Sequence, residues 1–147
     1  MSAAQDRPLA RPLAASVLEL TLWGEAAGRP VRATEGIAAV VMNRVRLAAA
    51  PGGPQHLGQG VAAVCRAPFQ FPCWLPARRA ALREAMRADD PALAICRRIA
   101  ARALAGALPD PTRGATHYHP AEILPRWALG RVPTVELGGV VFYRLLG

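Results

Sequence analysis

The chain has 147 residues, of which 52% are hydrophobic, which is enough apolar material for one compact domain and argues against disorder over the whole length. All 18 basic side chains are arginines, and the net charge of +8 attracts polyanions such as nucleic acid, anionic lipid or a carboxylate-bearing cell wall. Every apolar stretch is interrupted well before the ~20 residues that a membrane-crossing helix needs.

The first eleven residues are polar and are predicted to form a flexible segment, followed by a single domain over 12–147. The arginines of this segment do not precede the apolar run of a secretory signal. We therefore expect the protein to be made in the cytoplasm and to reach any target beyond it by another route.

Proline and glycine divide the rest of the chain into helices. The first helix is predicted to begin near Pro12, because proline is tolerated in a first turn, and to end at Gly28-Arg29-Pro30. The second is predicted to start at a Thr34 cap and to end before Pro51. Further helices are expected at about 57–65, 77–88 and 91–105, with a structured loop over 66–76.

The helical pattern of the sequence ends at Gly106. Two short stretches, 115–119 and 140–144, are β-branched or alternating and are predicted to pair as a hairpin. The predicted fold class is therefore mainly α (α+β), a helical domain with a small β-hairpin near the C-terminus.

Three cysteines cannot all pair within one chain. Cys65 and Cys73 are close enough for a short loop disulfide, whereas Cys96 lies in an apolar helical run and is expected to be a buried thiol. The alternative is three reduced thiols. The chain contains no C-x-x-C, which argues against a zinc ribbon.

Glu25 stands at the end of the first, otherwise apolar, helix. A carboxyl group in a cleft lined by apolar atoms loses the solvation of its charged form and can act as a general acid toward a glycosidic oxygen. The alternative is an exposed glutamate that ends an amphipathic helix.

Five segments share their order and spacing with a known family. They are Trp23-Gly24-Glu25-Ala26-Ala27-Gly28, residues 36–45 (GIAAVVMNRV), residues 69–74 (FQFPCW), residues 108–119 (LPDPTRGATHYH) and Phe142-Tyr143-Arg144. Together they resemble the SleB-type cell wall hydrolase family. The resemblance implies a lysozyme-like, lytic-transglycosylase-like domain that cleaves the bond between N-acetylmuramic acid and N-acetylglucosamine in peptidoglycan.

The resemblance also assigns expected roles. Glu25 is the catalytic acid, and it would work without a second carboxylate because transglycosylases of this kind use the sugar's own 6-hydroxyl. Gln70 is expected in the cleft, Tyr118 is expected to hydrogen-bond Glu25, and His119 to donate to an acetamido group. Trp74 and Tyr143 are expected to bind substrate. His119 replaces an asparagine of the relatives, and Val140 replaces a histidine.

The sequence holds two further patterns of acidic and histidine side chains. Glu35, the nearest other carboxylate, is expected in the first turn of the second helix, where it suits the helix dipole. His117 and His119 with Glu122 have the alternation of a metal site on a strand, but hydrogen-bonding histidines are preferred, so no metal and no cofactor are expected.

Two rival functions remain at this point. One is a zinc-dependent N-acetylmuramoyl-alanine amidase, and the other is a basic helical module that binds nucleic acid. The sequence lacks a helix-turn-helix pattern, so peptidoglycan rather than nucleic acid is the expected partner. A phage or prophage lysis route, with lysis or tail-associated proteins as further partners, is the expected way to the wall.

Overall fold

The computed structural model describes residues 12–67 and 70–147; the predicted flexible segment 1–11 and Phe69 of the FQFPCW segment lie outside the described residues. The helices are α1 (Leu13–Ala26), α2 (Val31–Ala49), α3 (Val61–Arg66), α4 (Pro76–Ala88) and α5 (Pro91–Leu104). The strands are β1 (His117–Pro120), β2 (Val135–Leu137) and β3 (Val140–Tyr143). Short 3-10 helices lie at η2 (Gln55–Leu57), η3 (Pro72–Trp74) and η4 (Arg126–Ala128).

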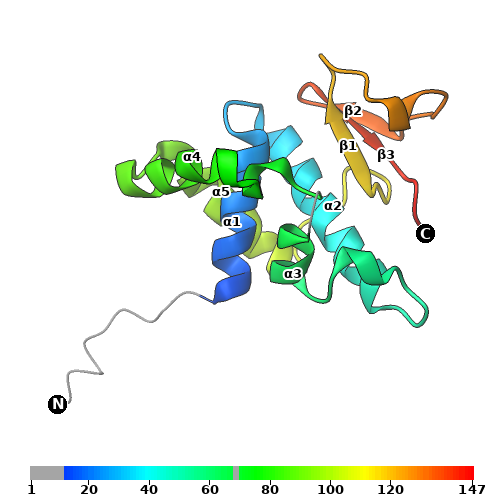
Figure 1. Ribbon diagram of the computed structural model, residues 1–147, viewed down its shortest axis with the longest axis horizontal. Helices are drawn as coiled ribbons and strands as arrows, with labels where there is room; N and C mark the ends of the chain where they lie inside the picture. The colour runs from blue at the N-terminus through cyan, green and yellow to red at the C-terminus, as the bar shows by residue number, and fades with distance from the viewer. Residues whose placement is uncertain (1–11, 68–69) are drawn as a thin grey trace.

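Helix α1 lies at the centre of the helical layer and contacts α2, α3 and α5 (Figure 1). Its sequence is apolar on several faces, as expected for a helix surrounded by others. Leu18 and Leu22 are fully buried, and each contributes about 1.5–3 kcal/mol through burial. The buried Glu19 accepts from Arg97 Nε of α5 at 2.9 Å, which joins the two helices. The predicted first helix is confirmed.

Helix α2 begins earlier than predicted, at Val31 directly after Pro30, and the Thr34 cap is wrong because Thr34 is buried inside the helix. The fixed φ of proline already suits a helix start, so the chain turns there. Glu35 consequently lies beyond the first turn, so the expected interaction with the helix dipole is wrong. Glu35 instead forms an ion pair with Arg102 Nη1 of α5 at 3.4 Å.

The single helix expected over 57–65 is wrong. Gly58 and Gly60 adopt positive φ values of 90° and 84°, so they separate η2 from α3. Helices α4 and α5 agree with the prediction to within one residue at each end. No helix within the described residues is long and apolar enough to cross a membrane.

The sheet is antiparallel with the order β1-β3-β2. The predicted pairing of 115–119 with 140–144 is confirmed, since His117 lies opposite Tyr143. The hairpin, however, joins β3 to β2 through Gly138-Gly139, both at positive φ, and β2 was not predicted. A Gly-Gly pair between short β-branched runs is a local hairpin signal that could have identified this turn.

The sheet is held to α2 by packing and by hydrogen bonds. Phe142 is fully buried against Gly36, where a Cβ atom would overlap its ring. Arg44 Nε donates to the Thr116 carbonyl at 2.8 Å, and Asn43 Nδ2 donates to the Ala115 carbonyl at 2.9 Å. The start of β1 therefore has a fixed position relative to the helices.

Candidate functional site

Glu25 lies in the last turn of α1, half-buried, with both carboxyl oxygens engaged. The Tyr118 hydroxyl of β1 donates to Oε1, and the backbone N–H of Cys73 in η3 donates to Oε2 at 3.1 Å. Three segments that are distant in sequence thus converge on one carboxyl group. Its orientation is fixed by two donors rather than by solvent.

Segment η3 reaches Glu25 because α1 carries small and polar residues on that side. A Cβ atom at Gly24 would overlap the Cys73 side chain, so glycine allows the close approach. The Trp74 indole Nε1 donates to Thr21 Oγ1 at 2.9 Å, and this hydroxyl donates in turn to the Val17 carbonyl. The bond from Trp74 to Thr21 therefore holds the neighbouring Cys73 amide in place against α1, the helix that carries Glu25.

Tyr118 packs between Phe71 and Phe142, with ring centroids 6.4 and 6.0 Å away. Burial, and then the charge of Glu25, raise the pKa of the Tyr118 phenol well above its usual range, so the hydroxyl keeps its proton. A hydroxyl can donate to a carboxylate and can also accept from a carboxylic acid. Tyr118 can therefore orient Glu25 in either protonation state.

Arg44 is a buried cation beside this pair, 4% exposed, and it was given no role from the sequence. Beyond its bond to Thr116, its Nη1 donates to Gln70 Oε1 at 3.2 Å, and its guanidinium lies 5.0 Å from the Phe71 ring centroid. Burial lowers the pKa of Arg44, while interactions with Tyr118, Cys65 and Glu25 act in the opposite direction. An arginine within the apolar stripe of a predicted helix is the signal that could have identified it, since arginine is seldom buried without partners.

The predicted hydrogen bond from Tyr118 to Glu25 is present. Gln70 lies next to this pair, because it accepts from the guanidinium of Arg44. Trp74 adjoins this group and lines a cavity of about 390 Å³ together with Phe71.

His119 and Tyr143 lie elsewhere. His119 is buried, with Nδ1 2.7 Å from the Pro120 carbonyl and Nε2 2.9 Å from the Tyr143 hydroxyl. Both of its ring nitrogens are engaged inside the protein, so this geometry gives no support to the expected contact with an acetamido group. Tyr143 is buried too and stacks on the His119 ring.

Several of the other described carboxylates have partners away from Glu25. The ion pairs are Glu19–Arg97, Glu35–Arg102, Glu84–Arg87 and Glu122–Arg29. Asp110 accepts from the backbone N–H groups of Thr112 and Gly114 and from Asn43, which shapes the turn before β1.

The candidate metal ligands and the cysteines are among the described residues. No group of three or more His, Cys, Asp or Glu within residues 12–67 and 70–147 is placed to hold a metal ion. The three cysteines, all among these residues, are buried and free, so the Cys65–Cys73 disulfide is not formed. Burial raises the pKa of Cys65 and Cys96 to about 11 and that of Cys73 further, which keeps all three as thiols.

Residues 28–143 match the model of a family described as Cell Wall Hydrolase, a region that begins just after Glu25. No curated protein matches the chain. The chain is similar to the catalytic domain of the germination-specific lytic transglycosylase SleB from Bacillus anthracis, with 19% identity and a TM-score of 0.67 over 94% of this chain and 99% of that one. It is also similar to the catalytic domain of the Bacillus cereus SleB protein, with 21% identity and a TM-score of 0.62 over 93% and 94% of the two chains. These likenesses establish the fold.

Proposed function

Because this chain belongs to the cell wall hydrolase family, we propose that it cleaves the glycosidic bond between N-acetylmuramic acid and N-acetylglucosamine in peptidoglycan, as a lytic transglycosylase. The observation that carries the proposal is the Glu25 carboxyl held between the Tyr118 hydroxyl and the Cys73 amide. The fold shared with two SleB catalytic domains supports it.

The proposed reaction uses one carboxyl twice. Glu25 first gives its proton to the glycosidic oxygen as the bond breaks. The 6-hydroxyl of the muramic acid then attacks the anomeric carbon and closes an anhydro ring, and its proton returns to Glu25. Tyr118 keeps the carboxyl in one orientation through both steps, since a hydroxyl serves as donor or acceptor.

The ion pairs of the other glutamates are consistent with a single working carboxyl. A hydrolase would need a second carboxyl about 5–9.5 Å from the first. The nearest acid along the next helix, Glu35, accepts instead from Arg102 of α5. The other ion-paired glutamates among the described residues likewise have arginine partners that do not contact Glu25.

The test is digestion of purified peptidoglycan, followed by mass spectrometry of the fragments. Anhydro-muramic ends support the proposal, whereas reducing ends would mean hydrolysis and released free peptides would mean an amidase. Glu25→Gln should lower the rate by about 10²–10⁴-fold, the usual contribution of a general acid.

Glu35→Gln is the matched control, because it makes the same chemical change on the neighbouring helix and loses one partly exposed ion pair. It should retain wild-type activity. Equal activity of Glu25→Gln and wild type would contradict the assignment of Glu25.

A further inference from the structure

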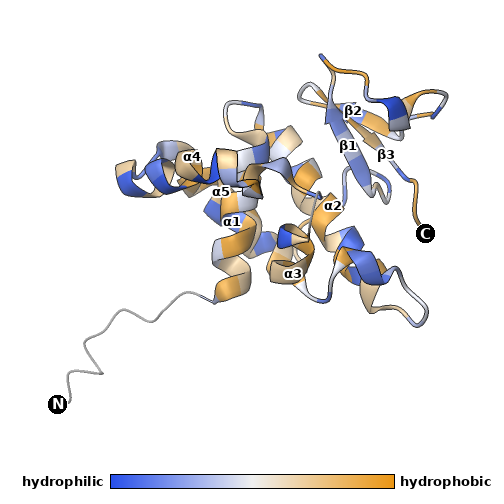
Figure 2. Ribbon diagram, in the orientation of Figure 1, coloured by the Kyte–Doolittle hydropathy of each residue, from blue (hydrophilic) through white to orange (hydrophobic). Residues whose placement is uncertain are grey.

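The connection from β1 to β2, residues 121–134, displays a group of large apolar side chains to solvent. Ile123, Leu124 and Leu129 are 59–64% exposed, and Val132 is 87% exposed. Figure 2 shows hydrophobic colouring along much of this connection, interrupted by a hydrophilic stretch. Single exposed apolar residues are ordinary, but several within one short connection mark an interaction surface.

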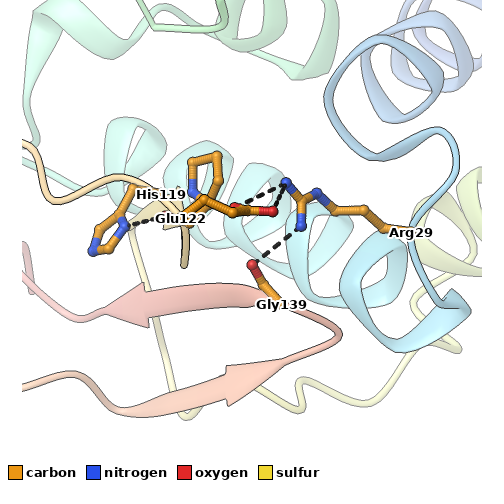
Figure 3. A network of polar contacts seen from close by, with 5 residues as sticks. Arg29, His119, Glu122 and Gly139 are labelled. Atoms are coloured by element: carbon orange, nitrogen blue, oxygen red, sulfur yellow. Dashed lines mark hydrogen bonds and ion pairs between the residues drawn. The ribbon is translucent and has the colours of Figure 1, made fainter.

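This connection is held in shape rather than loosely attached. The Ala121 N–H donates to the Gly139 carbonyl at 2.9 Å, and the Thr134 N–H donates to the Phe142 carbonyl at 2.8 Å. Arg29 from the turn after α1 donates to the Gly139 carbonyl and to Glu122, as Figure 3 shows. The apolar side chains are therefore presented by a fixed scaffold.

Trp127 anchors the middle of the connection on the sheet. Its ring packs edge-on against Tyr143 at 5.3 Å and near His119 at 5.6 Å between centroids. Successive side chains of a strand point to opposite faces, and Tyr118 is the residue of β1 that reaches Glu25. The connection thus covers the sheet face opposite to the one that contacts Glu25.

The charges on the connection are mostly positive. Arg126 and Arg131 are exposed, while Glu122 is the one acid in residues 121–134 and is paired with Arg29. Two copies of a chain with a net charge of +8 would repel each other if these surfaces met. Exposed apolar side chains, a tryptophan and arginines together are suited to an anionic bilayer, where the apolar groups enter the acyl boundary and the cations remain at the phosphates.

We propose that residues 121–134 bind the surface of an anionic lipid membrane. Ile123, Leu124 and Val132 enter the interface, and Arg126 with Arg131 contact the lipid headgroups. This second activity is independent of the glycosidase chemistry, since it uses the opposite face of the sheet.

The test is co-sedimentation of the full chain with vesicles of phosphatidylcholine alone or mixed with phosphatidylglycerol. Wild type should bind the mixed vesicles, less at high salt, and bind pure phosphatidylcholine at least about tenfold more weakly. Each arginine near an anionic surface strengthens binding about fivefold. The double variant Arg126→Gln/Arg131→Gln should therefore bind the mixed vesicles about 25-fold more weakly than wild type.

The triple variant Ile123→Ser/Leu124→Ser/Val132→Ser should lose binding to the mixed vesicles. Met86→Ser is the matched control, because Met86 is 57% exposed on α4 and is flanked by Arg83 and Arg87, yet lies outside the connection. It should bind as wild type does. Thermal unfolding and digestion of purified wall should be unchanged in every variant.

Four results would overturn the proposal. The triple variant could bind the mixed vesicles as wild type does, or wild type could fail to bind them. Alternatively, wild type could form a dimer in analytical ultracentrifugation that the triple variant abolishes, which would make this surface an interface between copies. A loss of wall digestion by the triple variant with normal unfolding would assign the surface to the sugar site instead, and would leave the test of Glu25 untouched.

Discussion

Tyr118→Phe isolates what the hydroxyl does for Glu25. The substitution removes one oxygen and leaves the ring between Phe71 and Phe142, where the centroids lie 6.4 and 6.0 Å away. Glu25 then retains the Cys73 amide on Oε2 and loses the donor on Oε1. A carboxyl group held by one donor can rotate, so the acid should spend less time in its reactive orientation.

The size of the effect follows from that bond. A hydrogen bond to a charged group contributes about 1.5–3 kcal/mol, which corresponds to a rate loss of about 10- to 150-fold if it acts fully in the transition state. The free energy of unfolding should fall by less, about 1 kcal/mol, because the half-buried Glu25 can recruit water in place of the phenol. The rate of release of anhydro-muropeptides and urea denaturation measure the two quantities.

Thr134→Val provides the control for loss of a hydroxyl near the same sheet. Its Oγ1 donates to the Phe142 carbonyl at 3.2 Å and has no contact with Glu25 in the described structure. It should change the rate by less than about twofold. Wild-type activity in folded Tyr118→Phe would refute the view that the phenol positions the acid.

Gly24→Ala should lower activity about tenfold or more and stability by about 1–3 kcal/mol, because the new methyl group overlaps Cys73 and pushes its amide away from the site; wall digestion and urea denaturation test this. Arg44→Met should cost about 1–3 kcal/mol in urea denaturation, since the buried partners of the guanidinium lose their donor, and Arg44→Lys should restore only part of it. Asp110→Asn tests the lowered pKa of the Asp110 carboxyl. Burial acts to raise this pKa, but the hydrogen bonds to the carboxylate outweigh burial and hold the pKa below 3.8. A carboxylate of this kind stabilises the fold above its unfolded pKa, so the difference in melting temperature from wild type should be full at pH 7 and should shrink as the pH falls below about 4. Burial, and then the charge of Arg44, lower the pKa of His117 from 6.5 to about 4. Between these two pH values the unfolded chain binds more protons than the folded one, so wild type should lose stability as the pH falls through this window. The melting temperature of His117→Gln should fall less over the same pH window than that of wild type. Equal pH profiles of melting temperature for the two proteins would contradict the reasoning.

The sequence by itself determined three of the helices and the position of the acid. Proline and glycine act on their immediate neighbours, so the ends of α1, α4 and α5 could be predicted from a few residues each. The place of Glu25 at the end of α1 followed from the same local signals. The resemblance of the late segment to a known family then supplied Tyr118 as its partner, which the structure confirms as a contact.

The alternation of side chains within β1 also constrains His119. Once Tyr118 is assigned to Glu25, period-two geometry turns its neighbour His119 to the opposite face. The structure shows this outcome, with His119 bonded to Tyr143 beneath Trp127. A sugar contact for His119 thus conflicted with the contact predicted for Tyr118, and the sequence alone could have exposed the conflict.

Tertiary structure decided the remaining parts of the site. The Cys73 amide meets Glu25 across 48 residues, and Arg44 meets the Thr116 carbonyl across 72. Neither contact leaves a local pattern, because a backbone N–H or carbonyl exists at almost every residue and only packing selects which one is used. The apolar surface of residues 121–134 likewise depends on which elements end up covered. Short-range sequence specifies elements, whereas the groups that surround Glu25 are selected by how these elements pack.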